Sequence, residues 1–344
     1  MFKNAISKLW IFSLLVAFAC KAENNIPIDP DSPAVTDTQF RLLGDTNDVS
    51  TITSGGTCLM GGSTDVDAAF KWMIAKSGGG DFVVIRSDIS YGYNPYVRKL
   101  GGVNSVETII IASVADAKNP LVATKIRNAE ALFIAGGDQK EYVTYWKDTP
   151  VEEAINYLIN TKHVPVGGTS AGCAILGSAY FSALKGTVTS VQAMHNPYSS
   201  LVALGYDDFI YNPFLQNTIT DQHFSQRDRE GRLVTFMARM KSDQGKDPRA
   251  IAVDEQTAVC VDQDGIAKVY GLNNAFFLQS GSLAPEACQS GTYLTWNQNK
   301  EAVKVYRIAA TTAGNGSFDL KDFTTASGGT WLWYYVDNGV FYTN

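Results

Sequence analysis

The stretch that most constrains the fold is "VPVGGTSAGCAILG", residues 164–177. An apolar run precedes Ser170 and a small-residue segment follows it, so the pattern predicts a buried strand, a sharp turn and a helix. Gly168 and Gly172, two positions on either side, remove side chains that would clash in such a turn. The hydroxyl would then project from the sheet as a nucleophile. The alternative is a glycine-rich loop before a tightly packed helix, because a chain with 30 glycines can match this pattern by chance.

The segments before this turn alternate between apolar runs and amphipathic stretches. The runs are rich in β-branched residues and suit strands of a parallel sheet buried on both faces. One amphipathic stretch opens with Thr149, Pro150 and Glu152, which is typical of a helix start. The predicted strands are 49–56, 81–86, 107–114 and 131–137, and the predicted helices are 64–80 and 149–162. This alternation predicts a doubly wound α/β catalytic domain over residues 49–262.

The last part of the chain has a different character. Aromatic and β-branched segments at 265–272, 302–309 and 329–344 are separated by Gly, Asn and Asp, which is typical of strands and hairpins. Asp337-Asn338-Gly339 predicts a tight turn. We expect a β-rich extension over 263–344, packed on the catalytic domain, whose aromatic tail serves packing or contact in a homodimer.

The amino terminus has the layout of an export signal. Lys3 and Lys8 precede a short apolar run that ends in small residues, so we expect a signal peptide over 1–19. Cys20 follows directly, so cleavage by a lipoprotein signal peptidase would leave a lipidated amino-terminal cysteine. In the sequence "AFAC", however, Phe18 stands where lipoprotein cleavage sites usually have a small residue, and plain secretion is the alternative. Polar, proline-rich residues 20–48 predict a flexible tether. We expect an exported protein that meets a membrane only through this lipid.

Composition excludes several classes of partner. The net charge of −6 argues against nucleic-acid binding. No Cys and His spacing resembles a zinc site. Of the four cysteines after residue 20, a pair such as Cys260 and Cys288 could form a bridge in an oxidising compartment; buried free thiols at Cys58, Cys173, Cys260 and Cys288 are the alternative.

A nucleophilic serine needs a base and an acid that orients the base. Among three histidines, His163 has a structural position and His195 lies in a polar loop. His223 follows an apolar-alternating strand at the sheet edge where doubly wound folds bind ligands, so it is the predicted base. The acid would come from Asp254 or Glu255, which interrupt an apolar run; the residues leave open which one, and charge pairing is the alternative.

Several further residues fit an acyl-transfer site. The amide of Ala171 is a natural donor to a developing oxyanion, and a glycine amide at 136–137 could be a second donor. Gln139 could bind a substrate amide or carboxylate. Arg227, Arg229 and Arg232 either pair with neighbouring acids on the surface or hold an anionic substrate group.

Four motifs together resemble the cyanophycinase branch of the peptidase E family of serine peptidases. They are "GGDQ" at 136–139, "GGTSAG" at 167–172, "DQHFSQRDREGRL" at 221–233 and "VDEQTA" at 253–258. The resemblance implies a flavodoxin-like, class I glutamine-amidotransferase-like α/β sheet and a triad of Ser170, His223 and Glu255. It implies Gly137 and Ala171 as oxyanion donors. The implied substrate-binding residues are Gln139, Asp221, Gln222, Arg227, Arg229 and Arg232.

The same resemblance implies a substrate and a reaction. Cyanophycin is a poly-aspartate backbone with arginine on each β-carboxyl, and release of β-aspartyl-arginine dipeptides is expected, without metal or organic cofactor. Asp221 could pair with a substrate arginine. Export departs from the intracellular enzymes of cells that store the polymer, so a related aspartyl or isoaspartyl dipeptidase is an alternative, as is a catalytically inactive surface binding protein. A class I amidotransferase is disfavoured, because Ser170 stands where those enzymes have cysteine.

Overall fold

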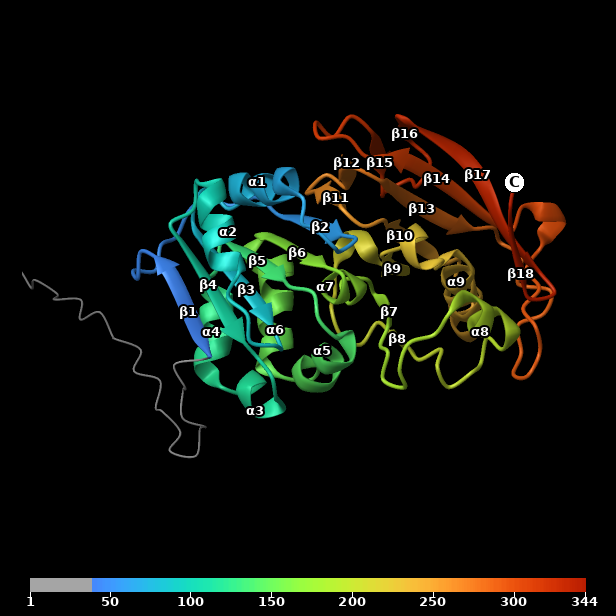
Figure 1. The fold of residues 1–344 in the computed structure, drawn as a ribbon, viewed down its shortest axis with the longest axis horizontal. Helices are drawn as coiled ribbons and strands as arrows, with labels where there is room; N and C mark the ends of the chain where they lie inside the picture. The colour runs from blue at the N-terminus through green and yellow to red at the C-terminus, as the bar shows by residue number, and fades with distance from the viewer. Residues whose placement is uncertain (1–38) are drawn as a thin grey trace, which may run out of the picture. The chain divides into compact units, whose positions relative to one another are not determined.

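The computed structural model describes residues 39–344, which belong to one compact unit (Figure 1). The predicted signal peptide, Cys20 and residues 20–38 of the predicted tether lie outside the described residues. Within the described part the chain builds two sheets, and helices cover them.

The first sheet has ten strands in the order β1-β4-β3-β5-β6-β2-β11-β12-β15-β16. The neighbours from β4 to β2 are parallel, and every other neighbouring pair in this sheet is antiparallel. The strands are β1 (Phe40–Gly44), β2 (Gly56–Met60), β3 (Asp81–Arg86), β4 (Ser105–Ile110), β5 (Ala131–Ile134), β6 (Pro165–Thr169), β11 (Thr257–Asp262), β12 (Ile266–Gly271), β15 (Ser317–Asp319) and β16 (Ala326–Ser327). The strands β4-β3-β5-β6 have the flavodoxin-like order 2-1-3-4, counted from β3, and the earlier strand β2 takes the next place.

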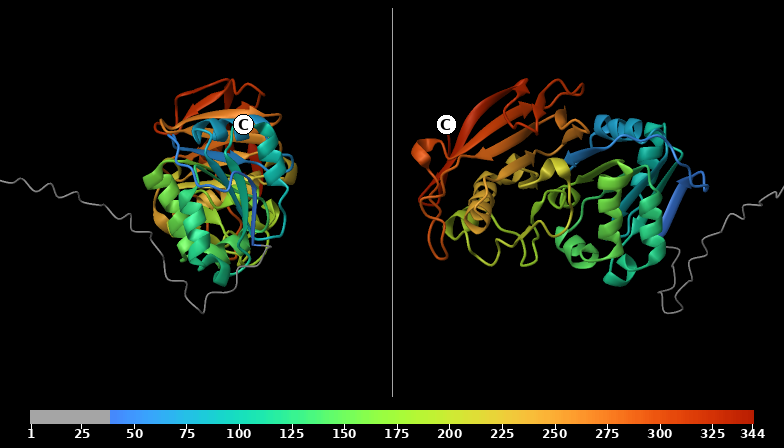
Figure 2. Two further views of the ribbon diagram at one scale, coloured as in Figure 1. Left: turned by 90° about the vertical axis from the view of Figure 1, so that its left-hand side faces the viewer. Right: turned by 180° about the vertical axis from the view of Figure 1, so that it is seen from behind.

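Helices cover both faces of the parallel part of this sheet (Figure 2). On one face lie α1 (Asp67–Lys76) and α2 (Tyr93–Leu100); on the other lie α3 (Val114–Ala117), α4 (Pro120–Asn128), α5 (Gln139–Trp146) and α6 (Pro150–Tyr157). Successive residues of β3 point to opposite faces: Phe82 packs in the cluster that contains α1, and Val83 packs in the cluster that contains α4. This two-sided burial explains why the parallel strands are continuous apolar runs.

The second sheet has eight strands in the order β18-β17-β14-β13-β10-β9-β7-β8. They are β7 (Ala179–Phe181), β8 (Leu204–Tyr206), β9 (Thr218–Gln222), β10 (Arg249–Val253), β13 (Asn274–Ser280), β14 (Val303–Ala309), β17 (Gly329–Asp337) and β18 (Val340–Thr343). The helices α8 (Ser190–His195) and α9 (Glu230–Gln244) pack on it through a separate apolar core that includes Phe236, Met237 and Trp296. Short helical segments complete the fold: α7 (Ala171–Ala174), η1 (Leu158–Lys162), η2 (Pro213–Leu215), η3 (Ser225–Arg227) and η4 (Gln298–Lys300).

The predicted α/β class with a β-rich carboxyl-terminal region is confirmed. The strands after residue 262 extend both sheets: β12, β15 and β16 join the first, and β13, β14, β17 and β18 join the second. The separate domain boundary at 262 stays a prediction. The predicted turn is present, because Asn338 and Gly339 have φ of 46° and 77° between β17 and β18.

Two predicted segments are wrong in part. The strand expected at 49–56 is β2 at Gly56–Met60, so the glycines open the strand instead of closing it, and the buried apolar run "CLM" provides its core contacts. The predicted tether, 20–48, contains a strand: β1 pairs antiparallel with β4, register Phe40 to Ile109. Pairing of its backbone groups with β4 offsets the polar character that suggested a tether.

Candidate active site

Ser170 lies on a strained turn between β6 and α7. Its φ and ψ are 50° and −116°, a conformation rare for a residue with a side chain. A Cβ on Gly168 would come 2.5 Å from the carbonyl carbon of Gly172, and a Cβ on Gly172 would come 2.1 Å from the oxygen of Ile134. Only glycine fits at these two positions, so the flanking glycines act as the sequence pattern predicted.

His223 comes from the other sheet, directly after β9. Its Nε2 lies 2.8 Å from Ser170 Oγ. The last residue of β2 and the residue after it hold the backbones of both residues, since the amide of Ser170 donates to Met60 O at 3.1 Å and that of His223 donates to Gly61 O at 2.8 Å. Gly62, with φ of +97°, leaves room for the imidazole, because a Cβ there would lie 2.4 Å from Cε1. Sequence reasoning missed Gly62; the Gly61-Gly62 pair after an apolar run is the signal that could have found it.

Glu255 follows β10, the parallel neighbour of β9, so both side chains leave the second sheet at one edge. Its Oε1 lies 2.6 Å from His223 Nδ1. Asp254 points elsewhere: it is fully buried and accepts hydrogen bonds from the amides of Ser225, at 2.9 Å, and Asn274, at 3.1 Å. The geometry therefore distinguishes the two acids that the sequence left open.

The surroundings of His223 favour its neutral form. Burial lowers the pKa of the imidazole below its ordinary value, the hydrogen bond to Glu255 opposes this, and the charges of Arg227 and Arg229 lower the pKa further. With the proton on Nδ1, the ring donates to Glu255 and accepts from the Ser170 hydroxyl. A neutral imidazole in this position can take the serine proton near pH 7.

The backbone amides of Ala171 and Gly137 lie near the serine without hydrogen-bond acceptors among the described residues. Ala171 is the first residue of α7, a position whose amide has no partner within a helix. Gly137 follows β5 and lines the same pocket as Ser170. Within residues 39–344, neither amide donates a hydrogen bond to another group. Both are therefore available to a bound molecule.

A pocket of about 310 Å³ opens beside Ser170. Of the predicted substrate-binding residues, five line it: Gln139, Gln222, Arg227, Arg229 and Arg232. Its walls also include residues that sequence reasoning missed: Asp138, Lys140, Phe181, Ala183, Gly186 and Thr187. Most of these lie around β7 and the loop after it, where the sequence carries no pattern that points to a site.

Asp221 stands behind the arginines. Its side chain is 3% exposed, and both carboxylate oxygens accept from Arg232, with Nε to Oδ2 at 2.9 Å. Arg229 adds an ion pair at 3.5 Å and donates to Gln222 O at 2.7 Å. Burial lowers the pKa of Arg229 to about 10, so its guanidinium stays charged at neutral pH. Asp221 is thus engaged by the protein's own arginines, which differs from the expected pairing with a substrate arginine.

The other histidines and the cysteines lie apart from this chemistry. His163 ends η1 in a left-handed conformation with φ of 54°, and His195 stacks on Tyr293 with ring centroids 4.6 Å apart. Cys58, Cys173, Cys260 and Cys288 are free. The bridge considered between Cys260 and Cys288 is absent, because the two residues pack in different apolar cores.

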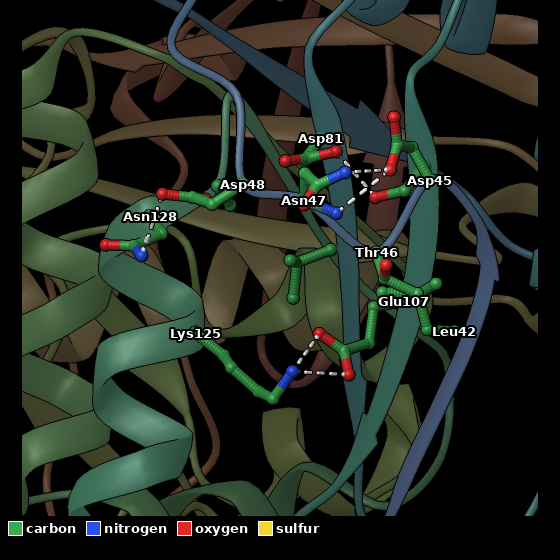
Figure 3. A pocket seen from close by; sticks show the side chains of 12 residues that line it. Leu42, Asp45, Thr46, Asn47, Asp48, Asp81, Glu107, Lys125 and Asn128 are labelled. Atoms are coloured by element: carbon green, nitrogen blue, oxygen red, sulfur yellow. Dashed lines mark hydrogen bonds and ion pairs between the residues drawn. The ribbon is translucent and has the colours of Figure 1, made fainter.

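A second hollow lies at the opposite, amino-terminal edge of the first sheet, where β3 and β4 begin (Figure 3). Its acidic side chains have partners within the hollow: Lys125 donates to Glu107 at 2.8 Å, Asn128 to Asp48 at 3.1 Å, and Asn47 to Asp45 at 2.9 Å. Within the described residues no group of His, Cys, Asp or Glu is arranged to hold a metal ion, and no helix is long and apolar enough to span a membrane.

An elbow serine hydrogen-bonded to a histidine, which in turn contacts a carboxylate, on an α/β fold defines the class of serine-type hydrolases. A family model described as peptidase family S51 matches residues 91–269, more than half of the chain. The chain belongs to peptidase family S51, whose members are serine-type peptidases.

Known relatives are cyanophycinases. The chain is 27% identical over 179 residues to cyanophycinase from Synechococcus elongatus, covering 52% of this chain and 50% of that protein. It is 28% identical over 170 residues to the cyanophycinase from Trichormus variabilis, covering 49% and 52%. The chain thus spans about half the length of the curated relatives that it matches. A solved peptidase from an acI-B1 Actinobacterium shares the fold, with a TM-score of 0.50, 16% identity, and coverage of 78% of this chain and 98% of that one.

Proposed function

We propose that this protein is an exported serine exopeptidase that hydrolyses cyanophycin to β-Asp-Arg dipeptides through a triad of Ser170, His223 and Glu255. The observation that carries the proposal is the hydrogen-bonded series from Ser170 Oγ to His223 Nε2, 2.8 Å, and from His223 Nδ1 to Glu255 Oε1, 2.6 Å, beside a cationic pocket. The resemblance to cyanophycinases supplies the polymer and the dipeptide product.

In the acylation step His223 takes the proton of Ser170 as the hydroxyl oxygen attacks an aspartyl carbonyl carbon. Glu255 holds the Nδ1 proton and stabilises the imidazolium that forms. The amides of Ala171 and Gly137 donate to the oxygen of the tetrahedral intermediate. The imidazolium then gives its proton to the departing amine, and the peptide C–N bond breaks.

In the deacylation step water takes the place of the amine. His223 removes a proton from the water, whose oxygen attacks the acyl carbon, and then returns the proton to Ser170 Oγ. Both steps need the imidazole in its neutral form at the start. The burial that lowers the pKa of His223 supports this requirement.

The pocket chemistry supports an aspartyl substrate. The pocket is lined by four basic residues, Lys140, Arg227, Arg229 and Arg232. Within residues 39–344, Asp138 is the one acidic residue that lines it. Guanidinium groups bind carboxylates in a bidentate manner, so a free carboxylate of the substrate, either of a terminal aspartyl or of an arginine linked to it, fits here. Gln222 Oε1 is buried and has no partner among the described residues, so it can accept from a substrate amide.

The same pocket also supports a second candidate, a dipeptidase for aspartyl or isoaspartyl peptides, because such peptides also carry a free carboxylate beside the aspartyl carbonyl. The two candidates differ in where the substrate arginine goes. With Asp221 engaged by Arg232 and Arg229, a cyanophycin arginine would extend away from this pocket.

The test is incubation of the full chain with purified cyanophycin, with Ser170→Ala alongside and detection of β-Asp-Arg by mass spectrometry. We expect dipeptide from the wild-type protein only. Activity on short aspartyl peptides without release from the polymer would favour the dipeptidase. Full activity of Ser170→Ala would refute the triad, and inactivity on both substrates would favour a binding protein.

Export and lipidation rest on the amino-terminal sequence. We propose that Cys20 carries a lipid and that the mature protein is held at a membrane through it. Intact-mass analysis of protein purified from membranes would give a mass that starts at Cys20 and includes acyl chains. An unmodified amino terminus would refute the lipid anchor, and retention of residues 1–19 would refute export.

A further inference from the structure

Two buried cysteines face each other across neighbouring strands of the first sheet. Cys58 in β2 and Cys260 in β11 are direct partners in the antiparallel register. Their sulfur atoms lie 3.9 Å apart, and the residues are 0% and 2% exposed. Both side chains project to the sheet face that α1 covers, in the same apolar cluster.

The surrounding residues are shaped to accept this sulfur pair. On the far side of β2, the parallel strand β6 carries Gly167 next to Cys58, and a Cβ there would lie 2.9 Å from Cys58 Cβ and 2.9 Å from Met73 Sδ. The missing side chain at Gly167 therefore leaves room for the Cys58 side chain beside its partner Cys260. Cβ atoms of directly opposed antiparallel residues are about 4.5–5.5 Å apart, slightly more than the roughly 3.5–4.5 Å that a disulfide needs. A small approach of two adjacent strands therefore suffices.

We propose that Cys58 and Cys260 form a disulfide bond when the protein is exposed to an oxidant. The two thiols lose two protons and two electrons, and an external disulfide, either of a thiol–disulfide oxidoreductase or of glutathione, is reduced to two thiols. One cysteine thiolate attacks the external disulfide, forms a mixed disulfide and releases the first external thiol; the other cysteine then attacks the protein sulfur of the mixed disulfide, closes the bond and releases the second external thiol.

The bond would lock the strand pair that carries the backbone of the candidate site. Three residues beyond Cys58, Gly61 donates to Thr257 O at 3.0 Å and accepts from the amide of His223 at 2.8 Å. Met60 lies between Cys58 and Gly61 in sequence, and its carbonyl oxygen accepts a hydrogen bond from the amide of Ser170. Strand β11 begins two residues after Glu255. A covalent link between β2 and β11 would therefore restrain the backbone that hydrogen-bonds to Ser170 and His223.

Burial decides when the bond forms. The hydrogen bond with Cys260, followed by burial, raises the pKa of the Cys58 thiol well above its ordinary value, so the folded protein offers little thiolate. Oxidation is therefore expected during folding, before β2 and β11 are covered by α1. The same burial would shield the finished bond from reductants.

The test is to refold the full chain in a glutathione redox buffer, quench with acid, and alkylate under denaturing conditions. We expect two thiols to escape alkylation, and proteolysis without reductant to yield one peptide pair joined through Cys58 and Cys260. Complete alkylation of every cysteine, or a bridge between another pair, would overturn the proposal. This readout needs no variant and no activity.

Stability provides a second readout. The bond would close a loop spanning 202 positions, so wild-type protein that is unfolded, reduced and refolded with reductant is expected to have a Tm roughly 5–10 °C below that of the oxidised protein. Cys58→Ala combined with Cys260→Ala should remove the effect of reductant, whereas Cys288→Ala, at a half-buried free thiol, should retain it. If reductant shifts the Tm of the double variant as much as that of the wild type, the bridge is not between these residues.

Discussion

Gly62 is the residue whose replacement tests the site geometry most sharply. It has φ of +97°, and an added Cβ would lie 2.4 Å from Cε1 and 2.4 Å from Nε2 of His223. Carbon atoms in contact are normally about 3.5–4.0 Å apart. In Gly62→Ala the imidazole must therefore retreat by roughly 1 Å, and the hydrogen bond of 2.8 Å to Ser170 Oγ is lost.

The size of the effect follows from this displacement. A misplacement of about 1 Å in a catalytic group costs on the order of 100-fold in rate, which corresponds to about 2.7 kcal/mol. The positive φ adds a strain of roughly 1–3 kcal/mol to the folded state. Gly62→Ala should thus lose both activity and stability, by separate physical causes.

A second glycine separates the two causes. Gly101 has φ of +80° but an added Cβ there meets nothing within 4 Å. Gly101→Ala should lower the Tm to an extent similar to Gly62→Ala and leave the site intact. The assay is the second-order rate of Ser170 labelling by a fluorophosphonate, which reports the serine–histidine pair without knowledge of the substrate. Labelling of Gly62→Ala at the wild-type rate would refute the argument that this glycine makes room for the base.

Three further predictions concern the carboxylates and arginines of the site. Glu255→Gln should lower kcat by roughly 10³–10⁴-fold with little change in Tm, since an amide cannot stabilise the imidazolium; a drop below tenfold would remove Glu255 from the triad. Arg232→Met should lower the free energy of unfolding in urea by about 3–5 kcal/mol, because Asp221 loses its bidentate partner; the loss should be nearer the lower value, since Arg229 remains. Arg227→Met, at an exposed position, should change this free energy by less than about 0.5 kcal/mol. The acid limb of the pH profile of kcat/KM should lie below pH 6.5, because the pKa of His223 is lowered and the neutral imidazole is the active form. Arg227→Gln removes a positive charge that lowers this pKa, so it should move the acid limb to higher pH. A move to lower pH would contradict this electrostatic cause.

Local features of the fold and site were predictable because they depend on neighbours in sequence. The strain at Ser170 follows from a serine between Gly168 and Gly172, and the two-sided burial of β3 follows from its continuous apolar residues. The helix α6 begins with Pro150 behind a Thr149 side chain that accepts from the amide of Val151, as its opening residues predicted.

Long-range features were beyond the sequence pattern. The preference for Glu255 over Asp254 depends on which side chain meets His223 after two parallel strands pair. Alternation along the strand places the two acids on opposite faces, but it does not tell which face lies toward His223. The role of Asp221 depends on a buried contact with Arg232. The strand β1 owes its existence to the open edge of β4, since its own residues are mostly exposed or half-exposed.

The placement of Ser170 on one sheet and of its partners on another has a consequence for biosynthesis. The serine is made 53 residues before His223, and the edge of β2 that supports both of them stays uncovered until β11 is complete. A growing chain therefore carries its nucleophile without a base while the residues between Ser170 and His223 are added. Hydrolytic competence would arise only after β11 is made and pairs with β2, so an incomplete chain that stops before this strand would be inert.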